Sequence, residues 1–439
     1  MKKIASNIAW LLSDKVFRLG LTLLVTIMVA RYLGPAQFGE LNFVIALVSI
    51  FAVVAGFGLQ ATVVNDLVMF PEKVEAIVVN ALIIKLASAF ICYLALILTI
   101  VILRPEGDLA RIYVAIFGMT LFAKCADVYR YWFEAKIKSK HIVWSENCVL
   151  ILVAALKLIM VYLQAPLLSF VWILVLEYFL VLLVAHWVFH HQVSFRVALS
   201  CFDLDTAKSL MSKSWPLLIS AAAWVLYAKI DQVMLAELTG DEQVGIYSVA
   251  VRLSEVTNFV PGILVFSFMP AILPLFKTRN AQYLRRLQQI YDLLFISMFC
   301  LAIFITLLAP WLVIVLFGHE FAASSEILRI HIWGAIFTAF SLISARHLVN
   351  IQMQKVLMFR NILGLILNIV LNWIFIPEYG GVGAAWASLI SLICVNYALD
   401  LFHPKLRHIF VLKTKSILQF NLLSNLKELV FYMRKINRS

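Results

Sequence analysis

The sequence predicts an all-α membrane protein that crosses the bilayer about twelve times and consists of two related halves. Of its 439 residues, 63% are hydrophobic and only 14% are charged, whereas a soluble domain carries about 25% charged residues. The mean hydropathy is +0.96. The phrase Gly34-Pro35-Ala36-Gln37-Phe38-Gly39 returns as Gly240-Asp241-Glu242-Gln243-Val244-Gly245, with Gly, Gln and Gly at the same spacing. These observations exclude a soluble globular protein and indicate a duplicated architecture.

Apolar stretches support the helix count, because about 20 consecutive apolar residues are long enough to span a bilayer as a helix. The predicted spans are 9–32, 41–63, 77–103, 110–132, 143–163, 167–189, 214–238, 246–275, 290–317, 325–348, 356–376 and 382–402.

The spans divide the chain into two lobes. We expect an N-terminal six-helix lobe over 1–190, a cytoplasmic linker over 191–213, a C-terminal six-helix lobe over 214–402 and a basic cytoplasmic tail over 403–439. Both copies of the phrase then lie on the same side of the membrane. The repeat is therefore parallel, with a pseudo-twofold axis along the membrane normal, and such halves usually enclose a central cavity. The tail fits either an amphipathic helix in the cytoplasmic interface or a frayed basic segment.

The net charge of +12 is explained better by membrane topology than by nucleic acid. Most Lys and Arg residues fall in loops and tails on one side, in clusters at 136–140, at 277–286 and beyond 403. The positive-inside rule makes this side cytoplasmic. An even number of crossings then places both termini in the cytoplasm, and no nucleic-acid partner is predicted.

Signals for enzymatic chemistry are absent from the sequence. The six cysteines form no CxxC pair and are interpreted as small apolar fillers. His186 and His190 have the spacing of two metal ligands on a helix, but no third ligand accompanies them. We find no Walker loop and no Ser/His/Asp arrangement. The sequence therefore predicts no catalytic residue, no metal and no cofactor.

Charges inside the predicted spans are candidate functional residues, because each costs at least about 2.5 kcal/mol on insertion scales. Cations and anions balance, so counting alone does not predict a positive cavity. The cations are Lys15, Arg18, Lys85, Lys124, Lys157, Lys229, Arg252 and Arg329, and the anions are Asp14, Asp127, Glu146, Glu177, Asp231, Glu255, Asp292 and Glu326.

Eight of these charges lie three or four residues from an opposite charge, where both side chains share a helix face and can neutralise each other. Each of these pairs can be a structural ion pair or part of a functional site, and the sequence leaves both interpretations open. The pairs are Asp14–Arg18, Lys124–Asp127, Arg252–Glu255 and Glu326–Arg329.

Other intramembrane charges have no partner of this local kind. Lys157 lies near the external end of its span, where a lysine can snorkel to the interface. Lys85 and Lys229 lie deeper and require a partner on another helix or an anionic ligand. Pro261 and Pro270 interrupt the span 246–275, and they predict either a bend used in conformational change or a static kink.

Four stretches and one glycine-rich turn match the pattern of a known family, and the match extends over about residues 5–400. They are Ala30-Arg31-Tyr32-Leu33-Gly34 through Phe38-Gly39; Tyr131-Trp132-Phe133-Glu134-Ala135 with the run Lys136–Lys140; Ser214-Trp215-Pro216 through Lys229-Ile230-Asp231-Gln232-Val233-Met234; Val244-Gly245-Ile246-Tyr247-Ser248 through Arg252-Leu253-Ser254-Glu255 to Pro261 and Pro270; and the turn Gly380-Gly381-Val382-Gly383.

On these residues the chain resembles the polysaccharide-transporter branch of the multidrug/oligosaccharidyl-lipid/polysaccharide exporter superfamily, specifically the Wzx-type O-antigen flippases. The resemblance implies a non-enzymatic transporter in the bacterial inner membrane. Such proteins move undecaprenyl-diphosphate-linked repeat units from the cytoplasmic to the periplasmic leaflet by alternating access. An ion gradient, of H⁺ or Na⁺, is expected to drive the cycle. The expected partners are this lipid-linked oligosaccharide, membrane lipid and other polysaccharide assembly proteins.

The resemblance also gives the intramembrane charges roles, as hypotheses. A diphosphate suits Arg through bidentate geometry and Lys as a point charge. A buried carboxylate with a raised pKa can carry a proton. The substrate-binding candidates are Arg18, Arg252, Lys229, Lys85 and Lys15; the coupling-ion candidates are Asp231, Glu255 and Asp14; and the bending candidates are Pro261 and Pro270.

Three other functions remain open at this point. A drug or metabolite antiporter of the same superfamily would favour cationic compounds and a cavity dominated by carboxylates. A membrane enzyme of polysaccharide assembly would need a large external loop, which the predicted spans do not leave. A scaffold in an assembly complex would affect surface glycan without affecting the flipping of its precursor.

Overall fold

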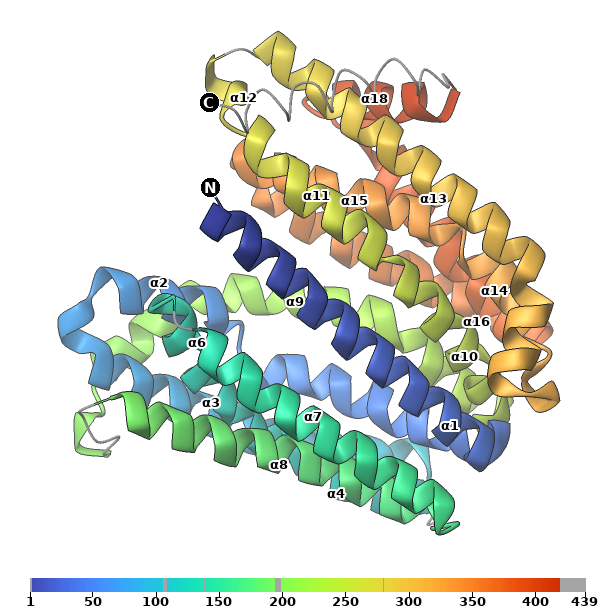
Figure 1. The fold of residues 1–439 in the computed structure, drawn as a ribbon, viewed down its shortest axis with the longest axis horizontal. Coiled ribbons are helices and arrows are strands. Elements are labelled where there is room, and N and C mark those ends of the chain that lie inside the picture. The colour runs from blue at the N-terminus through green and yellow to red at the C-terminus, as the bar shows by residue number, and fades with distance from the viewer. Residues whose placement is uncertain (1, 106–108, 138, 194–198, 279, 419–439) are drawn as a thin grey trace. The chain divides into compact units, whose positions relative to one another are not determined.

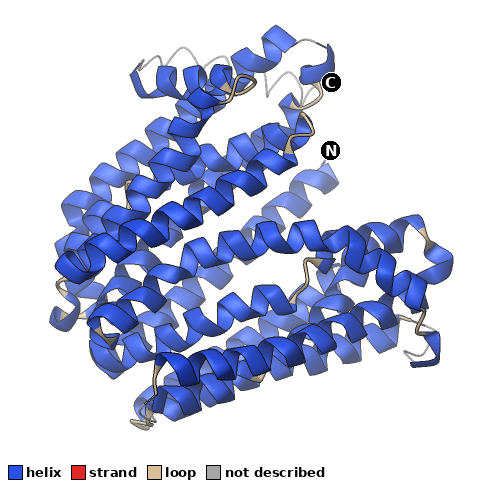
Figure 2. Ribbon diagram, turned by 180° about the vertical axis from the view of Figure 1, so that it is seen from behind, coloured by secondary structure: helices blue, strands red, loops and turns tan. Residues whose placement is uncertain are grey.

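The structure is a computed structural model that describes residues 2–105, 109–137, 139–193, 199–278 and 280–418 (Figure 1). These residues form helices and no strand (Figure 2). Ten of their helical segments are long and apolar enough to cross a membrane. Two segments, Asp14–Met69 and Gln354–Phe402, each contain a glycine with non-helical backbone angles, at Gly34 and Gly380. Counting two crossings for each bent segment gives the predicted twelve.

Contacts divide the chain into two compact units. The N-terminal unit is Gly20–Gly245, and the C-terminal unit combines Met1–Leu19 with Ile246–Ser439. Helix α9, Leu204–Thr239, packs on α2 and α3 and therefore belongs to the N-terminal unit. The lobes expected from the sequence, with a boundary between 190 and 214, do not coincide with these units, and the division into lobes stays a prediction.

In the N-terminal unit, α7 packs against its sequential neighbour α8, whereas α2 packs against the more distant helices α6 and α9. The predicted span 110–132 is a chain of shorter helices. The elements are α1 (Lys2–Ala55, from Gly20 onward), α2 (Leu59–Met69), η1 (Pro71–Lys73), α3 (Val74–Leu103), α4 (Leu109–Gly118), α5 (Thr120–Ala123), η2 (Lys124–Ala126), α6 (Asp127–Ala135), α7 (Ser139–Tyr162), α8 (Leu167–Gln192), η3 (Leu199–Cys201) and α9.

An aromatic core joins α6 and α8 in this unit. Phe133 and Phe189 are completely buried, and the ring centroids of Trp132 and Phe189 are 5.4 Å apart at a near-perpendicular angle. Edge-to-face pairs of this kind contribute about 0.5–1.5 kcal/mol beyond area burial. The motif Tyr131-Trp132-Phe133 noted in the sequence is therefore part of the core of the unit.

The start of α9 is fixed by a side-chain cap. The carboxylate of Asp203 accepts hydrogen bonds from the backbone amides of Asp205 and Thr206, which satisfies donors left free at a helix start. The Thr206 hydroxyl also donates to this carboxylate. These hydrogen bonds lower the pKa of Asp203.

The C-terminal unit is built around α13, which packs against α11, α14, α15 and α18. The elements are α10 (Asp241–Thr257, from Ile246 onward), α11 (Phe259–Ile272), α12 (Leu275–Thr278), α13 (Asn280–Phe317), η4 (His319–Phe321), α14 (Ser324–His331), α15 (Gly334–Asn350), α16 (Gln354–Ile393), η5 (Cys394–Ala398), α17 (Leu399–Phe402) and α18 (Arg407–Leu418).

The predicted span 246–275 is interrupted between α10 and α11 at Asn258, and again near its end, between α11 and α12. Pro261 follows three residues later, and a proline ring clashes with the carbonyl of the residue four positions before it, here Thr257. The helix therefore breaks at the position where the ring of Pro261 prevents regular helical geometry. Helix α11 continues through Pro270 to Ile272. A part for either proline in gating stays a prediction.

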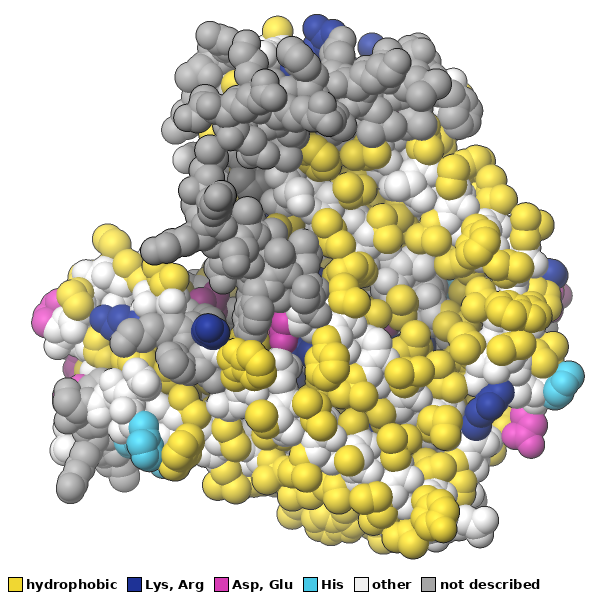
Figure 3. Space-filling model, viewed as in Figure 1, with side chains coloured by type: hydrophobic (Ala, Val, Ile, Leu, Met, Phe, Trp, Pro, Cys, Tyr) yellow, Lys and Arg dark blue, Asp and Glu magenta, His cyan; other side chains and the backbone are white. Residues whose placement is uncertain are grey.

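Large hydrophobic side chains cover much of the visible surface of both units (Figure 3). Examples are Trp172 and Leu183 on α8, and Phe304, Leu307 and Trp311 on α13, all of which are exposed. Exposed apolar area costs about 25 cal/mol per Å² in water, so this surface is suited to lipid. The molecule is a multi-pass membrane protein.

Part of the predicted tail is a packed helix. Helix α18 lies against α13, and its Lys413 and Ser416 are buried. The Ser416 hydroxyl donates to the Asp292 carboxylate over 2.6 Å. The remainder of the predicted tail, 419–439, lies outside the described residues.

Candidate functional site

The two repeated phrases begin with the same unusual backbone geometry. Gly34 has φ 70° and ψ 174°, and Gly240 has φ 94° and ψ 167°. This region of backbone space is essentially restricted to glycine. Each phrase therefore opens with a bend that only glycine adopts easily, and this agreement supports the interpretation of the sequence as a repeat.

The two phrases also contact each other through their second glycines. A Cβ atom on Gly39 would lie 1.7 Å from the carbonyl oxygen of Asp241, and one on Gly245 would lie 2.0 Å from the carbonyl oxygen of Pro35. Pro35 and Asp241 occupy the same position in the two phrases. The contact is thus reciprocal, as a pseudo-twofold axis requires. We call these two backbone contacts the glycine clasp.

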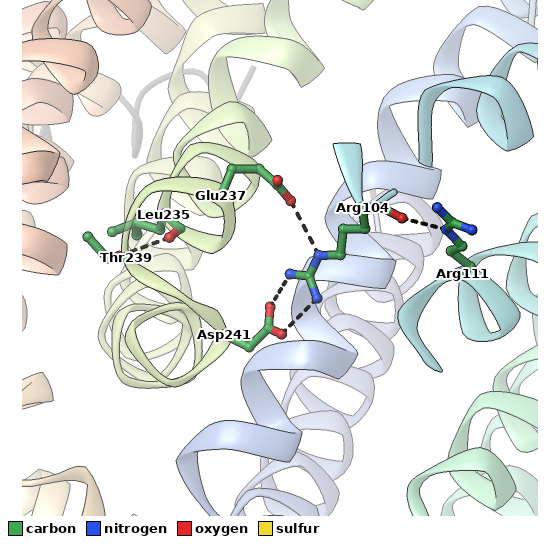
Figure 4. A network of polar contacts seen from close by, with 6 residues as sticks. All are labelled: Arg104, Arg111, Leu235, Glu237, Thr239 and Asp241. Atoms are coloured by element: carbon green, nitrogen blue, oxygen red, sulfur yellow. Dashed lines mark hydrogen bonds and ion pairs between the residues drawn. The ribbon is translucent and has the colours of Figure 1, made fainter. Parts of the chain in front are cut away.

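Arg104 binds the second phrase from the end of α3 (Figure 4). Its guanidinium donates to both carboxylate oxygens of Asp241, over 2.9 and 2.6 Å, and its Nε lies 3.4 Å from Glu237 Oε1. The guanidinium also lies 4.5 Å from the ring centre of Phe43. Arg111 donates to the Arg104 carbonyl and so holds this end of the helix in place. A bidentate Arg–carboxylate pair combines strength with fixed geometry.

The charges within the predicted spans do not reveal this Arg104 bridge, because Arg104 lies just beyond the span 77–103. A signal was available in the sequence. Two acids, Glu237 and Asp241, flank Gly240 on the side of the membrane where Arg104 ends its span.

Lys85 has a partner on another helix. The sequence required either such a partner or an anionic ligand, because Lys85 lies deep in its predicted span. Its Nζ lies 2.7 Å from Asp127 Oδ2, 2.8 Å from the Lys124 carbonyl oxygen and 3.5 Å from Tyr131 Oη. The side chain is 2% exposed. All three ammonium donors thus have protein acceptors, and Asp127, expected to pair locally with Lys124, lies against Lys85.

Two further lysines form ion pairs between helices. Lys157 Nζ lies 3.0 Å from Glu177 Oε2, so this lysine has an ion-pair partner on another helix; whether it also snorkels stays a prediction. Lys213 Nζ lies 2.9 Å from Asp66 Oδ2, which connects the start of α9 to α2. In each case the cation pairs with a carboxylate on a neighbouring helix.

The expected pair between Asp14 and Arg18 is present, with Arg18 Nε 3.3 Å from Asp14 Oδ2. Lys15, next to Asp14, is exposed. The expected pair between Arg252 and Glu255 does not form, and Glu255 is exposed. Local spacing therefore predicted one of these two pairs correctly.

Arg252 and Lys229 are the remaining substrate-binding candidates. Both are partly buried, and neither forms a hydrogen bond or an ion pair with any residue that the structure describes. Asp231, two residues after Lys229, is 5% exposed. A partly buried cation without an acceptor from the protein is a group that an anionic ligand can satisfy.

A buried charge cluster in the C-terminal unit was also missed. Arg360 and Lys413 share the carboxylate of Asp400, with Lys413 Nζ 2.7 Å from Asp400 Oδ2. Lys413 also donates to the Asn396 carbonyl oxygen over 2.6 Å. Burial and the charge of Arg360 lower the pKa of Lys413 well below its usual range. The partners come from α16, α17 and α18, so no local spacing predicts the cluster.

Comparison with known proteins identifies two matching families. The family described as polysaccharide biosynthesis protein matches residues 4–279, and the MatE family matches residues 216–374. A putative O-antigen transporter of Shigella dysenteriae is 26% identical over 208 residues, which is 47% of this chain and 50% of that protein. An uncharacterized membrane protein of Methanocaldococcus jannaschii is 26% identical over 200 residues, or 45% of each chain. This chain spans about half the length of these curated relatives.

Solved structures share the fold. The lipid II flippase MurJ in an inward closed conformation has a TM-score of 0.71 and 15% identity, with 93% of this chain and 91% of that chain covered. An inward-facing multidrug resistance MATE transporter of the MOP superfamily has a TM-score of 0.70 and 14% identity, with 90% and 95% covered. The expected superfamily fold is thereby confirmed, and the matches point to a membrane transporter and not to an enzyme.

The glycine clasp predicts a strong effect of single methyl groups. Gly39→Ala and Gly245→Ala should each lower the stability of the protein by about 2 kcal/mol or more, because the added Cβ meets backbone that cannot rotate away. Gly20→Ala is the matched control, since a Cβ there meets nothing within 4 Å. It should be neutral or stabilising by about 0.5–1 kcal/mol. Thermal unfolding in detergent measures all three, and equal melting temperatures would contradict the contact.

The Lys85–Asp127 pair predicts that removing the carboxylate destabilises the protein more than removing the ammonium group does. Asp127→Asn should destabilise the protein by about 3 kcal/mol, because it leaves an ammonium that is 2% exposed without its counter-ion. Lys85→Met should cost less, since the Asp127 side chain it strands is 42% exposed. The double variant should recover part of the loss. Thermal unfolding of the three variants tests the order, and a larger loss for Lys85→Met than for Asp127→Asn would refute it.

Proposed function

This chain belongs to the polysaccharide biosynthesis protein family, and we propose that it is a lipid-linked oligosaccharide flippase. Its substrate is an undecaprenyl-diphosphate-linked repeat unit of O-antigen or a related polysaccharide. The protein moves this unit from the cytoplasmic to the periplasmic leaflet of the bacterial inner membrane, with both of its own termini in the cytoplasm. The observation that carries the proposal is the family match over residues 4–279, and the likeness to a lipid II flippase supports it.

The substrate is anionic, and the charges that receive it are cations without protein acceptors. Arg252 and Lys229 meet this condition among the described residues. Arg18, which pairs with Asp14, is a further substrate-binding candidate, because a guanidinium can bind a phosphate in bidentate geometry. Lys15 is exposed and contributes long-range attraction. Lys85 takes a lesser part, since its donors already have acceptors.

Transport by alternating access requires an external end that closes and opens. The glycine clasp joins the first hairpin of each half, and the Arg104 bridge connects the first half to the turn of the second. These contacts form the closed external end in our proposal. Outward opening separates them, while the helix break before Pro261 gives the second half a place to bend.

An ion gradient supplies the driving force in this proposal. Asp231, Glu255 and Asp14 are the residues that bind the coupling H⁺ or Na⁺. Asp231 is the strongest of them, because the residue is 5% exposed and a buried charge gains most from a bound counter-ion. No other cofactor is needed, and the partners are membrane lipid, the lipid-linked oligosaccharide and other polysaccharide assembly proteins.

A second candidate is export of a drug or metabolite, which the MatE family match over residues 216–374 favours. This function predicts altered drug susceptibility on expression in an efflux-deficient strain. The flippase function predicts no such change and restores surface polysaccharide instead.

Complementation of a flippase-null strain tests the proposal. Arg252→Ala and Arg18→Ala should each reduce surface polysaccharide about 10-fold or more at equal expression, because a hydrogen bond to a charged group is worth about 1.5–3 kcal/mol. Lys355→Ala, at the exposed start of α16, is the matched control and should restore it fully. Full restoration by both arginine variants would overturn their assignment, and failure of the wild-type chain to complement would overturn the function.

The Arg104 bridge predicts a shift in conformation. Arg104→Gln leaves Asp241 and Glu237 as two like charges at one turn, so the external end should open more often. A cysteine introduced at the buried Val244, in a background without native cysteines, should react about 3-fold faster with an impermeant maleimide added outside. Arg329→Gln is the control, since Arg329 is exposed and donates to a backbone carbonyl. Equal rates in the two variants would argue against a gate here.

A further inference from the structure

A pocket of about 360 Å³ lies within the C-terminal unit. It is found where α15 ends, where α13 and α16 begin, and where the chain leads from α17 into α18. The positive-inside pattern assigns this end of the unit to the cytoplasm. Small-molecule sites typically measure about 300–1,000 Å³, so the pocket can hold a head group rather than a single ion.

The polar groups of the pocket are all cationic or imidazole groups. Lys405 and His408 are exposed, and His347 is 2% exposed. No carboxylate belongs to the lining residues. Lysine and histidine N–H groups without a competing carboxylate favour a ligand with oxyanion acceptors.

His347 has an unused nitrogen at this pocket. Its Nδ1 lies 2.7 Å from Tyr283 Oη, and the two rings stack with centroids 5.7 Å apart. Its Nε2 is buried and has no hydrogen-bond partner among the described residues. Tyr283 Oη can donate to Nδ1 or accept from it, and in the tautomer in which it donates, Nε2 carries the proton and is a donor. A buried donor without an acceptor costs about 1–3 kcal/mol, which a ligand oxygen would recover.

The helix that supplies His408 is held rigidly. Lys413 is bound to Asp400, and Ser416 is bound to Asp292, so the second half of α18 is anchored to buried carboxylates. The His347 and His408 rings meet at right angles with centroids 5.5 Å apart.

From this geometry we infer that the pocket formed by His347, Lys405 and His408 binds a phosphate-bearing head group. Phe276, Leu284, Ile351 and Met353 supply its apolar wall. The phosphate comes from an anionic phospholipid or from a soluble phosphate compound, since both present the same oxyanion. The inference goes beyond the proposed function, because no residue predicted to bind the transported substrate lines this pocket.

Binding to the purified full chain in phosphatidylcholine nanodiscs tests the inference with two probes. Inorganic pyrophosphate is titrated calorimetrically, and retention of phosphatidylglycerol from mixed nanodiscs is measured by native mass spectrometry. The test variant is Lys405→Gln with His408→Gln, both at exposed positions. Lys415→Gln is the matched control, because Lys415 is exposed on the same helix and outside the pocket. All three proteins should have equal melting temperatures.

At least one probe should bind the wild type and the control equally, and bind the double variant at least 10-fold more weakly. Loss confined to pyrophosphate identifies a soluble ligand, and loss confined to phosphatidylglycerol identifies a lipid; either supports the site. Binding of neither probe to the wild type, or equal binding to the double variant, would overturn it. These outcomes are independent of polysaccharide flipping, so the inference and the proposed function can fail separately.

Discussion

The N-terminal unit depends on one close contact, in which the backbones of the two repeated phrases touch each other. Gly39 and Gly245 can meet the carbonyls of Asp241 and Pro35 only because neither has a side chain. The bends at Gly34 and Gly240 turn the helices so that the two phrases face each other. Helix α9 enters this contact at one end and is attached to α2 at its other end by Lys213 and Ser214. The first helix of the second half is thereby built into a unit made mostly of the first half.

The two repeated phrases share the same backbone geometry, but the charged residues around them differ. In the register of the repeat, Glu237 corresponds to Arg31, and Asp241 corresponds to Pro35. Arg104 therefore finds a pair of carboxylates at the second turn, whereas the first turn presents a cation and a proline at the same positions. Likewise, Asp231 corresponds to Val25, and Arg252 to Ala46. The two copies therefore share a backbone arrangement, while the charges are concentrated in the second copy.

The sequence predicted the helices well and the charge pairs poorly, for a physical reason. Spans follow from the length and polarity of contiguous residues, and glycine bends follow from a repeated motif, so both are local. The pair Asp14–Arg18 is equally local and was found. Lys85 with Asp127 and Lys157 with Glu177 join different helices, and the rotation of one helix against another decides such partners. Arg360, Asp400 and Lys413 come from three elements, which places them beyond any spacing rule.

The energies involved explain why the external end can act as a gate. Dispersion between backbones at the glycine clasp is weak for each atom pair and re-forms without rearrangement of side chains. The Arg104 side chain is 13% exposed and its acidic partners about a quarter exposed, so water replaces part of the bridge when it opens. Charged hydrogen bonds of this kind contribute about 1.5–3 kcal/mol. Moving a two-state equilibrium from 1:99 to 99:1 takes about 5.5 kcal/mol, which is more than one such charged hydrogen bond contributes. A fully buried network such as that of Asp400 would be too stable for this purpose, and it lies instead where α18 is anchored.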